Sequence, residues 1–297
     1  MSRQEKNSLR GILVSSAMRR QVNRLSKDTS ISNSINTLIK YKVNGLLTTD
    51  EKGVPVGVLS KTDIMGAYYA DLPLDSPLEY IMSSPPLFCQ SDDPLEKALE
   101  QMRDSGVYRL YVLGLKGNDV AGALAYPDIV GMLYQYCCDC EYSHFRQQKD
   151  EVGEYIRRLR VRDSMTRDIK SVTEDDSLVH AMEELSIYRM GAILVKDSAG
   201  RPAGVMSKTD LILAYKHGVD PQDPVKSVMS SPVQTCGADD LLEDAIRTTI
   251  YTDVHRLFVK ENSNDDLVGV FSLTDAARNR SGSCQACISS RITIQTN

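Results

Sequence analysis

The chain has 297 residues, of which 41% are hydrophobic, 25% charged and 6% aromatic. This is the composition of a globular protein with room for about two domains of average size, and it excludes disordered and fibrous proteins. The net charge is −5, and the Lys and Arg residues are scattered along the chain. No basic stripe is available for a phosphate backbone, so we expect no nucleic-acid partner.

The apolar stretches, such as residues 107–115, are interrupted by polar residues well before the roughly 20 residues that span a bilayer. The first 20 residues carry charges on both sides of a short apolar patch and lack the apolar core of a secretory signal. We therefore expect a cytoplasmic protein that has no membrane partner.

The chain is internally repeated. A shift of 147 residues aligns its halves without insertion, placing Met18 on Met165 and residues 60–63 on 207–210. A weaker shift of 64 to 65 residues carries Met18 to Met82 and Asp63 to Asp128. The sequence thus predicts four copies of one unit. Their expected ranges are 9–70, 71–136, 159–218 and 219–278, with a Cys-containing linker at 137–158 and a Cys-containing tail at 279–297.

The third copy shows the expected elements in chain order. A segment ending in Met165 and a short strand come first. Acidic and polar residues 174–177 then precede Leu178, Ala181, Met182 and Leu185, whose spacing predicts an amphipathic helix. Two β-rich runs at 192–195 and 202–206 predict a hairpin.

A helix is expected over 211–215, capped by Thr209 and Asp210. A unit of about 60 residues buries only a marginal core, so we expect each copy to pair with its neighbour.

The second strand of each predicted hairpin leads into a recurring ending, Gly, two apolar residues, Ser, any residue, Thr and Asp. Three copies keep it, at 57–63, 204–210 and 269–275, whereas residues 122–128 carry Ala125 and Pro127. This ending and the order of elements resemble the CBS domain, a unit that pairs into Bateman modules. The resemblance covers residues 9–278. It implies an α/β fold built of α+β CBS-type units, in which four CBS repeats form two Bateman modules packed as a disc.

The family binds adenosine nucleotides, with the motif Asp on the ribose hydroxyls and the Ser or Thr facing the phosphates. A helix start supplies free N–H groups for an anion, and a carboxylate accepts hydroxyl protons. The alternative is that the motif only caps a helix. The resemblance implies nucleotide-binding roles for Ser60, Thr62, Asp63, Asp128, Ser207, Thr209, Asp210, Ser272, Thr274 and Asp275. The cleft that relies on Ala125 and Asp128 should bind most weakly.

His255 and Arg256 resemble the His-Arg-Leu segment of the nucleotide-sensing γ subunit of AMP-activated kinase, where the basic pair contacts phosphate. Arg109 occupies the matching place in the second copy. Anion-contact capacity is therefore expected in copies two and four, the alternative being solvated arginines at strand starts. The Ser-Ser-Pro segments at 83–85 and 230–232 correspond to a family segment that lines the adenine pocket through its main chain.

Two C-x-x-C pairs, Cys137 with Cys140 and Cys284 with Cys287, match under the shift of 147 residues. Four thiolates that converge would suit zinc or an iron–sulfur centre. A redox dithiol in each pair and inherited small apolar residues are the alternatives. Cys89 and Cys236 are expected to pack as small hydrophobes.

The four histidines form no catalytic pattern with other residues. We therefore expect a non-enzymatic sensor that binds AMP, ADP or ATP and passes its occupancy to an unidentified regulated protein. S-adenosylmethionine is also bound within the family, and the sequence does not choose among these ligands. The alternative function is a metal- or redox-linked regulator that uses the cysteine pairs. A homodimer is left open.

Overall fold

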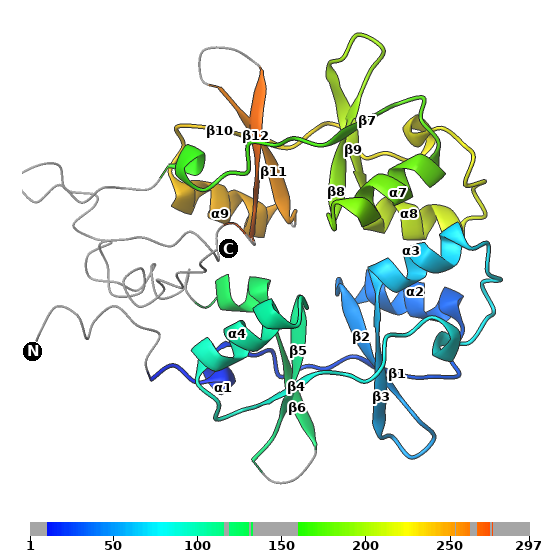
Figure 1. Cartoon of the computed structure of the whole chain (residues 1–297), viewed down its shortest axis with the longest axis vertical. Coiled ribbons are helices and arrows are strands. Elements are labelled where there is room, and N and C mark those ends of the chain that lie inside the picture. The colour runs from blue at the N-terminus through cyan, green and yellow to red at the C-terminus, as the bar shows by residue number, and fades with distance from the viewer. Residues whose placement is uncertain are drawn as a thin grey trace, which may run out of the picture. The chain divides into compact units, whose positions relative to one another are not determined.

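The computed structural model describes residues 11–115, 119–130, 132, 160–252, 254–261, 266–273 and 275. It contains four three-stranded sheets of identical topology, one for each copy (Figure 1). In each sheet the middle strand is parallel to the first and antiparallel to the third. The four repeats of the predicted α/β unit are thereby confirmed.

The strands of copy 1 are β1 (Arg24–Ser26), β2 (Gly45–Thr49) and β3 (Pro55–Ser60), and those of copy 2 are β4 (Phe88–Gln90), β5 (Arg109–Leu113) and β6 (Val120–Ala125). Copy 3 has β7 (Ser171–Thr173), β8 (Ala192–Lys196) and β9 (Pro202–Ser207). Copy 4 has β10 (Thr235–Gly237), β11 (Arg256–Lys260) and β12 (Leu267–Ser272).

A ten-residue helix joins the first two strands of every copy: α2 (Ile31–Lys40), α4 (Leu95–Asp104), α7 (Leu178–Ile187) and α9 (Leu242–Tyr251). In α7 the N-cap is Ser177, and Leu178, Ala181, Met182 and Leu185 are all buried. The apolar spacing read from the sequence is therefore confirmed as the core face of this helix.

A second helix follows the third strand, as α3 (Lys61–Tyr69) in copy 1 and α8 (Lys208–Lys216) in copy 3. Residues 126–130 of copy 2 are also helical. The remaining elements are short: α1 (Val14–Ala17), η1 (Leu78–Tyr80), η2 (Val161–Asp163) and η3 (Val225–Ser227). Over the described ranges, no helix has the length and apolar character needed to cross a membrane.

When each copy is counted from its first strand, a Met-ended segment precedes it and packs on a different copy. We call residues 12–19, 77–83, 160–166 and 224–230 the docking segments. Each forms an antiparallel bridge to a third strand: Arg19 to Ala123, Ser83 to Val58, Thr166 to Val270 and Ser230 to Val205. The segment before copy 1 thus docks on copy 2, and the segment before copy 2 docks on copy 1. The same exchange links copies 3 and 4.

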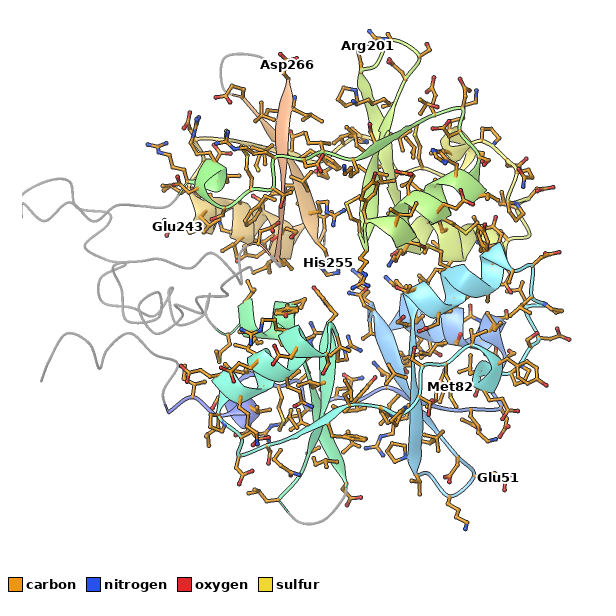
Figure 2. All side chains as sticks on the ribbon, in the orientation of Figure 1. Glu51, Met82, Arg201, Glu243, His255 and Asp266 are labelled. Carbon is orange, nitrogen blue, oxygen red and sulfur yellow. The ribbon has the colours of Figure 1, made fainter. Side chains whose placement is uncertain are left out.

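The motif glycine makes room for this docking. A Cβ added at Gly204 would lie 2.7 Å from the Ser230 carbonyl oxygen and 2.8 Å from the Met229 sulfur. Gly57, Gly122 and Gly269 are equally close to their own docking segments. In copy 1, Met82 (labelled in Figure 2) accepts a hydrogen bond from the Thr48 hydroxyl at 3.0 Å. The repeated Gly of the third strand and the repeated Met of the docking segment therefore pack against each other in every copy.

The copies gather into two compact units. Unit 1 comprises the described parts of Met1–Gln21, Leu87–Asp168 and Gln234–Asn297, and unit 2 comprises Val22–Pro86 and Ile169–Val233. One apolar core joins copy 2 with copy 4 in unit 1, and another joins copy 1 with copy 3 in unit 2. Each shared core joins alternate copies, and the exchanged docking segments connect the neighbouring copies that were expected to pair. A single amphipathic face per helix does not reveal which copy will cover it.

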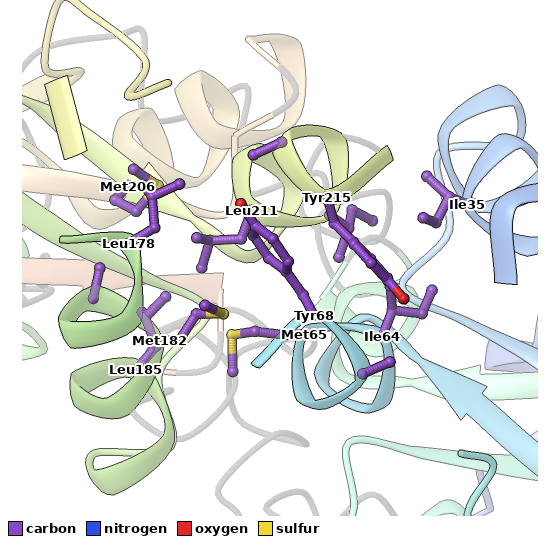
Figure 3. Close-up of a cluster of buried hydrophobic side chains, with 14 of the residues drawn as sticks. Ile35, Ile64, Met65, Tyr68, Leu178, Met182, Leu185, Met206, Leu211 and Tyr215 are labelled. Carbon is purple, nitrogen blue, oxygen red and sulfur yellow. The ribbon is translucent and has the colours of Figure 1, made fainter. Parts of the chain in front are cut away.

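In unit 2 the two copies meet through α3 and α8, which pack side by side (Figure 1). Tyr68 and Tyr215 stack there with ring centroids 5.0 Å apart (Figure 3). The Tyr68 hydroxyl donates to the Val219 carbonyl at 2.8 Å, and the Tyr215 hydroxyl donates to the Leu72 carbonyl. These reciprocal bonds fix the register of the two helices.

Because of this contact, we expect unit 2 to lose stability at alkaline pH. Burial, followed by the charges of Asp220 and Asp223, raises the pKa of Tyr68 from 10.0 to about 12. A raised pKa means that the folded state disfavours the phenolate, so the contribution is intact below pH 10 and is lost as pH rises through about 12. We expect the free energy of unfolding to fall less steeply over this window in Tyr68→Phe than in the wild type. Urea denaturation at several pH values tests this, and parallel curves would contradict it.

Candidate functional site

The predicted motif residues lie where the third strand of a copy passes into the next helix. In copy 1, Ser60 is the N-cap of α3 and its hydroxyl accepts from the backbone N–H of Thr62 and Asp63. Asp63 Oδ2 in turn accepts from the Ser60 backbone N–H and from its hydroxyl, both at 2.6 Å. This is a capping box, which fixes the carboxylate at the positive end of the helix.

A docking segment completes the site in copies 1 and 3. The Ser83 hydroxyl donates to Asp63 Oδ1 at 3.1 Å, and the Ser230 hydroxyl donates to Asp210 Oδ1 at 2.8 Å. Asp210 Oδ2 accepts from the backbone N–H and the hydroxyl of Ser207 at 2.8 and 2.5 Å. Each carboxylate is therefore held from two directions by neutral groups.

Copy 4 repeats the box in unit 1. Asp275 Oδ2 accepts from the Ser272 backbone N–H at 2.9 Å and from its hydroxyl at 2.6 Å. Thr274 lies outside the described residues, so its predicted role stays a prediction.

Copy 2 differs at the same place. Ala125 has no hydroxyl, and only its backbone N–H donates to Asp128 Oδ2, at 2.9 Å. The other carboxylate oxygen, Oδ1, accepts from Nε of Arg19, which comes from the docking segment. The motif carboxylate of copy 2 thus forms an ion pair with an arginine. In copies 1 and 3 the corresponding partners are the neutral hydroxyls of Ser83 and Ser230.

The prediction that Thr209 and Asp210 cap a helix beginning at Leu211 is wrong in part. The helix begins at Lys208, the N-cap is Ser207, and Asp210 completes the box from the first turn. The Thr209 hydroxyl accepts from Lys61 Nζ of copy 1 at 2.8 Å. Reciprocally, Thr62 accepts from Lys208 Nζ of copy 3 at 2.8 Å. Neither lysine was predicted as a site residue, because only the packing of α3 on α8 brings them to the opposite copy.

The two predicted arginines both lie in unit 1 and stand directly opposite their motifs. Arg256 pairs in register with Ser272, and Arg109 with Ala125. The matching strand positions in unit 2 are Gly45 and Ala192, opposite Ser60 and Ser207. Guanidinium groups are therefore present at this strand position only in copies 2 and 4.

Arg256 lies in a largely buried setting between copies 4 and 2 of unit 1. Burial lowers its pKa, and the nearby Asp275 and Tyr108 oppose that effect. Both the carboxylate of copy 4 and a side chain of copy 2 are thus close to this guanidinium. Its neighbour His255 is exposed at the start of β11 (Figure 2), and its carbonyl accepts from Leu273 N–H at 3.3 Å.

The predicted cysteine site cannot be placed, because Cys137, Cys140, Cys284 and Cys287 lie outside the described residues. Cys89 and Cys236 are free thiols that pack in or against the core of unit 1, as expected for small hydrophobes. Burial raises the pKa of each to about 12. Both are therefore thiols at neutral pH.

Comparisons with known proteins agree with this architecture. A family model described as "CBS domain" matches residues 14–70, 78–134, 160–217 and 225–282. The CBS domain-containing protein YhcV of Bacillus subtilis is 30% identical over 121 residues, which make up 40% of this chain and 84% of YhcV.

Two solved structures share the fold over most of the chain. MJ1225 from Methanocaldococcus jannaschii, proposed to be an archaeal homologue of g-AMPK, superposes with a TM-score of 0.72 at 16% identity. The match covers 89% of this chain and 98% of MJ1225. An uncharacterized conserved protein from Pyrococcus horikoshii superposes with a TM-score of 0.55 at 20% identity, over 89% of this chain and 97% of that one.

Proposed function

The chain belongs to the CBS-domain family, and we propose that it is a non-enzymatic regulatory protein that binds adenosine phosphates at its Ser–Asp boxes. The observation that carries the proposal is the recurrence of one carboxylate in one geometry. Asp63 and Asp210 lie in the first turn of a helix, and Asp63, Asp210 and Asp275 are each held by the Ser three positions earlier.

The capping geometry is compatible with ribose binding. A carboxylate offers about four lone-pair positions, and the hydrogen bonds from serine groups to Asp63 and Asp210 use three in each case. The Ser83 and Ser230 hydroxyls rotate and also accept hydrogen bonds, so a ribose hydroxyl can join or replace them. Capping thus orients the carboxylate and leaves it able to accept a hydrogen bond from a ligand.

The charges around the boxes favour a phosphorylated ligand over a nucleoside. Arg256 stands opposite Ser272 and close to Asp275 in copy 4. In unit 2, Lys61 and Lys208 lie at the starts of two helices whose N–H groups also favour anions. An adenosine phosphate could donate its ribose hydroxyls to the carboxylate and place its negatively charged phosphate against these cations.

Binding would be communicated through the shared contacts of a unit. Each motif Thr of unit 2 accepts from a lysine of the opposite copy, so a phosphate that draws one lysine toward itself also acts on a bond of the other motif. A ligand shifts a protein between two states only through different affinities for them. We propose that such a shift regulates a partner protein.

Calorimetry with AMP, ADP and ATP tests the proposal, with adenosine and GMP as controls for the phosphate and the base. We expect saturable binding of at least one adenosine phosphate, and weaker binding of adenosine. Arg256→Ala should reduce the preference for AMP over adenosine at its site by roughly tenfold or more, because a charge-assisted hydrogen bond contributes about 1.5–3 kcal/mol. No heat with any of the three nucleotides at millimolar concentration would contradict the proposal.

The proposal covers AMP, ADP and ATP, whose affinities the calorimetric titrations compare. Zinc or iron–sulfur binding by the two cysteine pairs stays a prediction, and metal analysis of anaerobically purified protein tests it separately.

A further inference from the structure

We infer that Arg19 is an internal occupant of the copy 2 motif, which closes that copy to ribose. The inference rests on the proposed function, because it concerns which of the four motifs a nucleotide can use. It limits the ribose-binding carboxylates to Asp63, Asp210 and Asp275.

The backbone holds Arg19 firmly at the motif. Its N–H donates to the Ala123 carbonyl and its carbonyl accepts from the Ala123 N–H, both at 2.9 Å. Gly122 permits this approach, since a Cβ there would lie 2.6 Å from the Arg19 carbonyl oxygen. The side chain then reaches the carboxylate of Asp128, which is only 7% exposed. The arginine is thus delivered to this carboxylate by a fixed backbone contact.

The other copies show what the arginine replaces. Ser83, Ser230 and Thr166 make the same bridge to the third strand in copies 1, 3 and 4. Ser83 and Ser230 donate a hydroxyl to the same carboxylate oxygen that Arg19 binds in copy 2. A hydroxyl is neutral and can accept from a ribose while it donates to the carboxylate. A guanidinium only donates, and its charge opposes exchange for a neutral hydroxyl.

The rest of the copy 2 motif agrees with closure. Ala125 replaces the Ser whose hydroxyl binds Asp Oδ2 elsewhere, and Pro127 removes one of the helix-start N–H groups. Tyr126, which follows Ala125, is buried against Tyr108, with ring centroids 5.4 Å apart. The copy 2 motif therefore holds a docking segment in place, while the motif carboxylates of copies 1 and 3 have neutral serine hydroxyls at that position.

The inference can be tested by adding an arginine to the motifs of copies 1 and 3 and by removing it from the motif of copy 2. Ser83→Arg and Ser230→Arg each put an arginine at the equivalent position of copies 1 and 3. Arg19→Ser combined with Ala125→Ser gives copy 2 the residues of copies 1 and 3. Arg20→Ser, which changes an exposed neighbouring arginine, is the matched control. The readout is the number of AMP sites and their affinities by calorimetry, with the denaturation midpoint of each variant confirming folding.

We expect each arginine transfer to weaken one wild-type site at least tenfold, the Arg19/Ala125 double variant to gain one site, and Arg20→Ser to match the wild type. If both folded transfer variants keep wild-type binding, or if the double variant gains no site, the inference is wrong while the proposed function stands. If neither the wild type nor any variant binds an adenosine phosphate, the proposed function itself is wrong and the inference falls with it.

Discussion

Replacing Asp275 by Ala will weaken adenosine-phosphate binding at copy 4 by roughly tenfold to a hundredfold. The carboxylate is the acceptor that we assign to the ribose hydroxyls, and a hydrogen bond to a charged group contributes about 1.5–3 kcal/mol. Its two bonds to Ser272 place it at the end of β12, and the other copies do not depend on it. Calorimetry should therefore show one weakened site beside unchanged ones.

Two variants separate ligand binding from helix capping. Asp275→Asn keeps an acceptor oxygen for the Ser272 N–H but loses the charge, so it should preserve the fold and still bind more weakly than the wild type. Asp128→Ala removes the equivalent carboxylate of copy 2, which is already paired with Arg19, and should leave nucleotide binding unchanged. Equal affinity in the wild type and a folded Asp275→Ala variant would reject the assignment.

Gly204→Ala will destabilise unit 2 by about 1–3 kcal/mol, the usual cost of adding a methyl group where there is no room. The new Cβ would lie 2.7 Å from the Ser230 carbonyl oxygen. A carbonyl cannot swing aside as a side chain does, and this residue also bonds to Val205 through its N–H and its carbonyl, at 2.9 and 2.8 Å. Urea denaturation should show a lower midpoint.

The matched control is Gly66→Ala in α3, where an added Cβ meets nothing within 4 Å. Alanine is favoured over glycine inside a helix by about 0.5–1 kcal/mol, so this variant should be as stable as the wild type or more so. A Gly204→Ala protein as stable as Gly66→Ala would show that the docking segment is not closely packed.

The elements within one copy could be predicted from the sequence because local rules determine them. The apolar residues of α7 recur at helical spacing and Ser177 is a favourable N-cap. The hairpin of β8 and β9 is two β-rich runs around a short turn. The exchange of docking segments was not predicted, although Gly204 and Met229 recur together in all four copies. Repetition of two residues in every copy indicates a shared role for each, but it does not indicate that they are in contact.

The residues of the candidate site could be proposed from the sequence, but the contacts between residues of different copies could not. Ser207 and Asp210 were predicted to bind the ligand, with helix capping as the alternative, and the bonds between them are compatible with both roles. Arg19 and Asp128 are 109 residues apart, and Lys61 lies 148 residues from Thr209. No sequence spacing indicates such pairs, because they depend on how separate copies pack.

The most direct test of the account is a crystal structure of the full chain grown with AMP. We predict ribose hydroxyls within hydrogen-bond distance of at least one of Asp63, Asp210 and Asp275, with the phosphate toward the helix start beside it. Asp128 should still be paired with Arg19. AMP bound away from all three carboxylates, or seated on Asp128 with Arg19 displaced, would contradict the account.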